Sequence, residues 1–267
     1  MFLFVHASGL HVVRHHAGAS DVPIMLVHGA PDRSKNFAHV VHQLGDLDVS
    51  VYDRRGYGKS LAAGEFGAGF AQHADDLIEL LEGTPHVVVG QSAGGSIAMM
   101  AATQAPELFA ALGVWEPPMV PWDWWMGREA WERTVSWALY TDPESLGEDF
   151  NRWILGDERW EQISSRTQDL LRAEGAAFRA DMSSQFEPYM DLDQLKVPFV
   201  VGCGTEAPDP RFRAAHRRLA ERANAALLVV EGADHFAHTN HPDAWVALVR
   251  TAVELAASVG NATIEPG

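Results

Sequence analysis

The residues best suited to chemistry in this chain centre on Ser92, within the pentapeptide Gly90-Gln91-Ser92-Ala93-Gly94. An apolar run, 87–89, precedes it, and an alanine- and methionine-rich run, 96–102, follows it, so we expect a strand, a sharp turn and a helix. The two glycines suit this turn because a side chain there would collide with the neighbouring strand or helix. A serine hydroxyl exposed at the apex of such a turn could attack a carbonyl carbon. Ser96, one helical turn further on, is the weaker candidate.

A serine hydroxyl is a poor nucleophile until a base takes its proton, and His235 is the candidate base. It lies in the segment Gly232-Ala233-Asp234-His235-Phe236, after the last apolar run and before a helical pattern. The chain has 13 histidines, so position rather than residue type selects this one. For the nearby His238 and His241 we expect a packing or solvated role and a helix start, respectively.

Short apolar runs alternate with longer amphipathic stretches, and these elements must position the two residues. The pattern predicts strands at 10–15, 24–27, 49–52, 87–89, 110–115, 197–201 and 226–230, and helices at 34–44, 70–81, 96–102, 211–222 and 242–257. This alternation predicts an α/β fold in which helices flank a mostly parallel central sheet on both faces.

The segment 117–196 interrupts that alternation. It shows no clear strand pattern and contains seven of the nine tryptophans. We therefore expect a core formed by residues 1–116 and 197–267, with residues 117–196 inserted as a helical cap. Met119, Trp122 and Trp125 follow the end of the expected strand before the insert, and we expect these side chains to line a substrate pocket.

Length and composition restrict the classes of function. A chain of 267 residues that is 47% hydrophobic can bury a sizeable core, and its net charge of −16 argues against nucleic acid and anionic membranes as partners. The single cysteine, Cys203, excludes an intrachain disulfide. The sequence shows no metal-ligand pattern, no signal peptide and no apolar run long enough to span a membrane. We expect a cytoplasmic protein without a metal or cofactor, and the sequence indicates no oligomeric state.

Four motifs in order along the chain resemble those of the α/β-hydrolase superfamily: His28-Gly29-Ala30-Pro31, Asp53-Arg54-Arg55-Gly56-Tyr57-Gly58-Lys59-Ser60, Gly90-Gln91-Ser92-Ala93-Gly94, and Gly232-Ala233-Asp234-His235-Phe236 followed by His241-Pro242. The resemblance covers essentially the whole chain and is to the serine-nucleophile, esterase- or lactonase-like branch with a helical cap. It implies that Ser92 is the nucleophile, that His235 is the base, and that the backbone N–H groups of Ala30 and Ala93 form the oxyanion hole.

The carboxylate that orients the histidine is less obvious from the sequence. The family usually places an aspartate after the strand that here ends near Gly202, but the segment Gly204-Thr205-Glu206-Ala207-Pro208 has alanine in that position. Glu206 and Asp209 lie one and two positions out of register. Glu116, at the end of the strand that follows the nucleophile helix, occupies an alternative acid position known in the superfamily. We expect Glu116 to be the acid, with Asp209 or Glu206 as alternatives.

These residues imply a serine hydrolase that cleaves an apolar carboxylic ester or lactone through an acyl-enzyme. The same triad could also serve carbon–carbon or amide bond hydrolysis, or perhydrolysis. The fold would also suit a ligand receptor or a cofactor-independent oxygenase. The sequence does not distinguish among substrates, because the pocket depends on how the cap folds.

Overall fold

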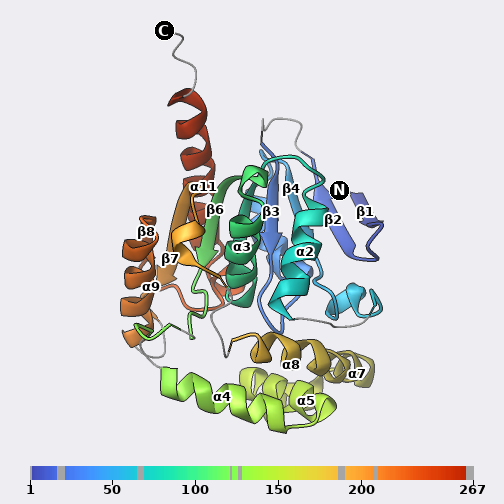
Figure 1. The fold of residues 1–267 in the computed structure, drawn as a ribbon. Coiled ribbons are helices and arrows are strands. Elements are labelled where there is room, and N and C mark those ends of the chain that lie inside the picture. Colours follow the sequence, from blue (N-terminus) through green and yellow to red (C-terminus); the bar gives the residue numbers. More distant parts are fainter. Residues whose placement is uncertain are drawn as a thin grey trace.

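The computed structural model describes residues 2–16, 22–64, 69–120, 122–125, 128–185, 190–206 and 210–262. These residues form an eight-stranded sheet in the order β1-β2-β4-β3-β5-β6-β7-β8 (Figure 1). β1 pairs with β2, and β2 with β4, in antiparallel fashion, whereas every other neighbouring pair is parallel. The predicted α/β fold with a mostly parallel sheet and flanking helices is therefore confirmed.

The bounds of the elements follow the sequence pattern closely. The strands are β1 (Phe2–Val5), β2 (His11–His15), β3 (Ile24–Val27), β4 (Val49–Tyr52), β5 (His86–Gln91), β6 (Phe109–Trp115), β7 (Phe199–Gly204) and β8 (Ala226–Val230). The helices around the sheet are α1 (Ala38–Gln43), α2 (Phe70–Leu80), α3 (Ala93–Gln104), α9 (Pro210–Arg222), α10 (Ala237–Asn240) and α11 (Pro242–Ala262).

Two expectations differ from the observed elements. The pattern did not predict β1, an edge strand whose single partner is β2. The helix expected at 34–44 is a short 3-10 helix, η1 (Ser34–Phe37), followed by α1. Three further 3-10 helices are η2 (Gly58–Ser60), η3 (Pro106–Leu108) and η4 (Leu192–Gln194).

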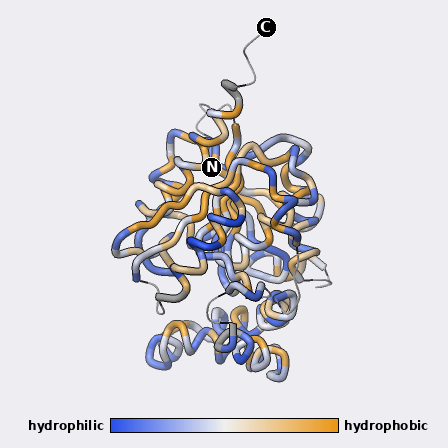
Figure 2. The backbone as a smooth tube through the Cα atoms, turned by 60° about the vertical axis from the view of Figure 1, so that its left-hand side comes forward, coloured by the Kyte–Doolittle hydropathy of each residue, from blue (hydrophilic) through white to orange (hydrophobic). Residues whose placement is uncertain are grey.

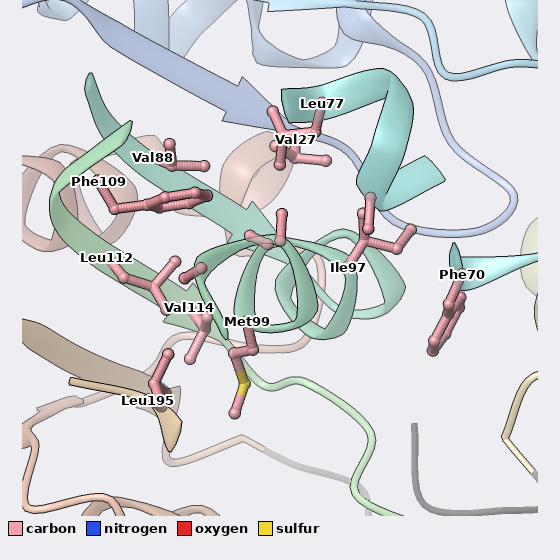
Figure 3. Close-up of a cluster of buried hydrophobic side chains, with 14 of the residues drawn as sticks. Val27, Phe70, Leu77, Val88, Ile97, Met99, Phe109, Leu112, Val114 and Leu195 are labelled. Atoms are coloured by element: carbon pink, nitrogen blue, oxygen red, sulfur yellow. The ribbon is translucent and has the colours of Figure 1, made fainter. Parts of the chain in front are cut away.

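Alternate residues of the central strands enter two separate apolar cores, one on each face of the sheet. In β3, Met25 and Val27 join the cluster under α2, α3 and α9, whereas Ile24 and Leu26 join the cluster under α1 and α11. Figure 3 shows part of the first cluster packed around α3. Burial of both faces explains why the parallel strands are continuous apolar runs in the sequence.

The chain between β6 and β7 forms a separate helical layer beyond one end of the sheet (Figure 1). We call it the α4–α8 layer, and it consists of α4 (Arg128–Tyr140), α5 (Pro143–Leu155), α6 (Asp157–Gln162), α7 (Ser165–Ala173) and α8 (Gly175–Ser183). Hydrophilic and hydrophobic residues alternate along these helices, whereas the strands are largely hydrophobic (Figure 2). The layer lies within the predicted cap, 117–196, whose boundaries stay a prediction.

Within the described ranges, none of the helices combines the length and the apolar character needed to cross a membrane.

Candidate active site

The backbone at Ser92 adopts the sharp turn that the pentapeptide predicts. β5 ends at Gln91, α3 begins at Ala93, and Ser92 between them has φ 50° and ψ −124°. This is a strained conformation for a residue with a side chain, and such strain is concentrated at functional sites. Gly94 is required for the tight approach of helix and strand, because a Cβ there would lie 2.5 Å from the carbonyl oxygen of Val27.

Glu116 and His235 are in direct contact, although 119 positions separate them in the chain. His235 Nδ1 lies 2.9 Å from Glu116 Oε2, and the N–H of Gly204 donates to Glu116 Oε1 at 3.0 Å. Because a carboxylate only accepts hydrogen bonds, this contact assigns the proton to Nδ1 and leaves Nε2 free to act as the base. The Glu116 side chain is only 4% exposed, whereas that of His235 is 33% exposed.

The electrostatics keep the glutamate ionised. Burial by itself would raise the pKa of Glu116, but the hydrogen bond and charge of His235, together with the Gly204 N–H, hold that pKa below its ordinary value. An ionised carboxylate in this place can stabilise an imidazolium that forms at His235 during reaction.

Backbone contacts bring the three predicted residues to the same end of the sheet. The N–H of Ser92 donates to the carbonyl of Trp115, the residue before Glu116, at 2.8 Å. The indole N–H of Trp115 donates to the carbonyl of Asp234, and the Gln91 side chain donates to that of His235. These hydrogen bonds therefore link the backbone segments that carry Ser92, Glu116 and His235 to one another.

The predicted oxyanion loop packs directly against the serine. Gly29 approaches so closely that a Cβ on it would lie 3.1 Å from Ser92 Cβ. Ala93 is the first residue of α3, so its N–H has no acceptor within the helix and is available to a ligand. Ala30, directly after Gly29, belongs to the same loop. The role of both N–H groups as oxyanion donors stays a prediction.

Of the two alternative acids, the structure describes Glu206. Glu206 is exposed, and its backbone N–H donates to the carbonyl of Ala233. Asp209 lies outside the described residues. Within the described part of the chain, the carboxylate that contacts the His235 ring is that of Glu116.

The three predicted pocket residues pack largely into the apolar core. Met119 is fully buried, and Trp125 is almost so, with its ring 5.7 Å from that of Phe212 and 5.5 Å from that of His216. Trp122 is half-buried against the same cluster. Their lining of a substrate pocket stays a prediction.

Two buried histidines lie near the site, and the sequence singles out one of them, His238. His216 on α9 is 2% exposed, and its Nε2 lies 3.3 Å from the carbonyl oxygen of Pro117, directly after Glu116. His238 is 1% exposed, and its Nε2 lies 2.9 Å from Asp32 Oδ2. This contact joins the segment directly after the predicted oxyanion loop to the segment that contains His235. From the sequence we expect His238 to be packed or solvated, and the structure shows that it is packed. No motif marks His216, so only a structure could place it.

We expect the protein to lose stability between pH 6.5 and 4 because of two buried imidazoles. Burial, followed by the charge of Arg54, lowers the pKa of His28 to about 4, and burial lowers the pKa of His216 to about 4. Between those pH values the unfolded chain binds protons at both residues that the folded chain does not, so the free energy of unfolding falls as pH falls. By pH 4, each of the two histidines lowers the free energy of unfolding by up to about 3 kcal/mol.

Urea unfolding at pH 7, 5.5 and 4.5 measures this loss. The variant His216→Gln should show a shallower decrease in midpoint with falling pH than the parent protein. A parent midpoint that does not change across this range would contradict the prediction.

Comparisons with known proteins agree with the fold. The sequence profile described as "Alpha/beta hydrolase family" matches residues 24–248. Among curated relatives, the chain is 28% identical to a 2-succinyl-6-hydroxy-2,4-cyclohexadiene-1-carboxylate synthase of Salmonella paratyphi A, over 86% of this chain and 93% of that protein. It is also 28% identical to lipase LipV of Mycobacterium tuberculosis, over 50% of this chain, and the match spans only about half (51%) of LipV's length.

Solved structures show the same architecture. A carboxylesterase of the thaumarchaeon Nitrososphaera gargenis superposes with a TM-score of 0.67 at 19% identity, covering 96% of this chain and 99% of that one. At this identity the likeness shows the fold alone. The match of the family profile to most of the sequence, together with the eight-stranded sheet and the sharp turn at Ser92, shows that the chain belongs to the alpha/beta hydrolase family.

Proposed function

We propose that this protein is a serine hydrolase that cleaves an apolar carboxylic ester or lactone. The observation that carries the proposal is the contact between His235 Nδ1 and the buried Glu116 carboxylate, at the end of the sheet where Ser92 occupies its strained turn. A histidine held in this tautomer can activate a serine hydroxyl for acyl transfer when its Nε2 reaches that hydroxyl.

In the proposed reaction, Ser92 Oγ attacks the substrate carbonyl carbon while His235 Nε2 takes the hydroxyl proton. The N–H groups of Ala30 and Ala93 stabilise the negative charge that develops on the carbonyl oxygen. The imidazolium of His235 then protonates the leaving alkoxide, and an acyl-enzyme remains. Water, deprotonated by His235, attacks the acyl carbon. The imidazolium then returns this proton to Ser92 Oγ as its bond to the acyl carbon breaks, which releases the acid and restores the free serine.

Exposed aromatic surface beside the base supports an apolar substrate. Phe236 is 38% exposed, although it is a large hydrophobic residue, and its ring lies 5.4 Å from that of His235 in an edge-to-face arrangement. An exposed aromatic ring beside the reacting groups provides an apolar contact for an acyl or lactone chain. We further propose that the α4–α8 layer covers the substrate as a cap.

Labelling with a fluorophosphonate tests the proposal directly, because the probe reacts with activated serines. We expect one adduct in the intact mass, mapped by digestion to the peptide that contains Ser92, and protection from labelling by a short-chain ester. Heat-denatured protein should not be labelled. The absence of an adduct on folded protein would contradict the proposal and would favour a ligand receptor on this fold.

A further inference from the structure

Arg54 is the most deeply buried arginine side chain of the described residues, with an exposed fraction of 0%. Its Nε donates to the carbonyl of His28 at 3.0 Å, and its Nη2 donates to the carbonyl of Gly29 at 2.7 Å. Both carbonyls belong to the predicted oxyanion loop. A charged group is costly to bury, so this arginine needs a compensating partner.

His28 completes the fixation of this loop. Its Nε2 accepts the backbone N–H of Arg54 at 2.8 Å, so the other ring nitrogen, Nδ1, carries the proton and donates to the Gly29 carbonyl at 2.7 Å. The imidazole is therefore neutral, in agreement with its pKa, which burial and the Arg54 charge lower to about 4. The Gly29 carbonyl thus accepts two hydrogen bonds from buried donors.

The orientation of this one carbonyl determines the direction of an oxyanion donor. Gly29 C=O and Ala30 N–H belong to the same peptide unit, which is trans, and in a trans peptide these two groups point in opposite directions. Holding the carbonyl toward Arg54 and His28 therefore turns the Ala30 N–H away from them. Gly29 lies beside the proposed nucleophile, because a Cβ on it would come within 3.1 Å of Ser92 Cβ. The peptide unit that carries the Ala30 N–H is therefore fixed next to Ser92.

The compensating charge for Arg54 comes from the α4–α8 layer. Asp181 of α8 is fully buried, and its Oδ2 accepts from Arg54 Nη2 at 2.9 Å and from the Tyr57 hydroxyl at 2.7 Å. Its Oδ1 lies 3.1 Å from His73 Nε2 on α2. Burial alone would raise the pKa of Asp181, but Arg54 and then His73 hold it well below its ordinary value, so the carboxylate is ionised.

A second buried carboxylate makes a parallel connection. Glu174, immediately before α8, is 2% exposed and bonds to the Arg33 guanidinium and to the N–H of Gly58. Arg33 continues the oxyanion loop, and Gly58 belongs to the same turn as Arg54 and Tyr57. Two ion pairs therefore join the α4–α8 layer to the core, Asp181 with Arg54 and Glu174 with Arg33. Both lie at the predicted oxyanion loop and at the turn that follows β4.

We propose that Asp181 and Arg54 are positioning residues, through which the α4–α8 layer orients the Gly29–Ala30 peptide and so aims one of the two oxyanion donors. Arg54 transmits the position of α8, because a single nitrogen, Nη2, bonds both to Asp181 and to the Gly29 carbonyl. This proposal rests on the hydrolase function proposed above. The proposal predicts that removing the charge of Asp181 lowers turnover, although Asp181 acts on the active site only through Arg54.

The test compares Asp181→Asn with Glu148→Gln. Glu148 is a matched control, because it also pairs with two arginines, Arg152 and Arg172, but both lie within the layer. For Asp181→Asn we expect kcat on the esters that the parent hydrolyses to fall about 30- to 300-fold, with KM changed less than about threefold, since the lost interaction acts on the transition state. Glu148→Gln should keep parental kcat. Parental kcat in folded Asp181→Asn would overturn the proposal.

A double variant separates positioning from a merely structural role and remains informative if Asp181→Asn does not fold. Arg54→Met combined with Asp181→Leu removes both buried charges, so folding stability should recover relative to the single variant. Turnover should not recover, because the bonds from Arg54 to the two loop carbonyls are gone. Parental kcat in this double variant would show that the pair serves stability alone.

Hydrogen exchange tests the coupling independently of catalysis. In Asp181→Asn, and equally in the double variant, the peptide covering residues 26–36 should exchange its amide hydrogens faster than in the parent, whereas Glu148→Gln should leave it unchanged. Unchanged exchange in the charge-removing variants would overturn the coupling. A parent that shows neither adduct nor turnover would instead contradict the proposed function, while the exchange result would still decide the positioning role.

Discussion

Replacing Ser92 with alanine should lower kcat on any ester that the parent hydrolyses by on the order of 10⁴- to 10⁶-fold, because no other hydroxyl occupies the turn. The substrate still binds, so KM should change little. The adduct with a fluorophosphonate should disappear. The turn itself should persist, because alanine, like serine, bears one Cβ at φ 50°. Initial rates with an activated ester, alongside thermal unfolding of both proteins, measure the change.

Ser96→Ala is the matched control. Ser96 lies one turn further along α3, is fully buried, and its hydroxyl donates to the carbonyl of Pro118 at 3.1 Å. Its loss should reduce stability by about 1 kcal/mol and leave kcat at the parental level. Substantial turnover in Ser92→Ala, or inactivity in a folded Ser96→Ala, would remove Ser92 from the role of nucleophile.

Replacing Glu116 with glutamine should lower kcat by roughly 10³- to 10⁴-fold, the second largest effect that we expect. The glutamine amide fits the same space, but it can present an N–H to His235 Nδ1 and so favour the tautomer that places the proton on Nε2. It also provides no negative charge to stabilise the imidazolium. Steady-state kinetics across pH 6–9 should show this loss throughout, because the glutamine does not titrate.

Asp209→Asn and Glu206→Gln are the controls for the choice of acid. Glu206 is exposed and should tolerate the change with parental kcat. Near-normal turnover in Glu116→Gln, combined with an inactive Asp209→Asn, would assign the acid to the segment after β7 instead. Unfolding of Glu116→Gln should be measured as well, because Glu116 also accepts the Gly204 N–H.

The sequence was most informative where the determinants are local. A strand, a turn and a helix around Ser92 follow from residues within about ten positions, and two flanking glycines can be recognised without a structure. Glu116 could be selected because the resemblance to the superfamily offers an alternative acid position at the end of this strand. The ends of neighbouring parallel strands meet at one edge of a sheet, and β6 lies between β5 and β7, so an acid there can reach the same histidine. The position of His235 after the last strand and the family resemblance at Glu116 therefore predicted a pair of residues that the structure brings into contact.

The parts that could not be predicted depend on contacts between distant segments. Arg54 is 127 positions from Asp181, and no periodicity relates a turn after β4 to a helix in the insert. Composition indicated that 117–196 was helical but not which helix faces the core, since amphipathic helices of similar pattern can pack in several arrangements. The sequence predicts that Met119 and Trp125 line a pocket. Whether such side chains face a pocket or the core depends on long-range packing, and the structure buries both.

The position of Glu116 also bears on how such enzymes can be recombined. Glu116, the predicted acid, is the last residue before the predicted insert. Its backbone N–H donates to the Gly202 carbonyl, and its carboxylate accepts from the Gly204 N–H, so it is anchored to the core. A chimera that exchanges the insert from residue 117 onward therefore retains all three predicted catalytic side chains, but it loses Asp181 and Glu174. Transplanted inserts should consequently need a matching pair of acidic residues opposite Arg54 and Arg33 before the hybrid is fully active.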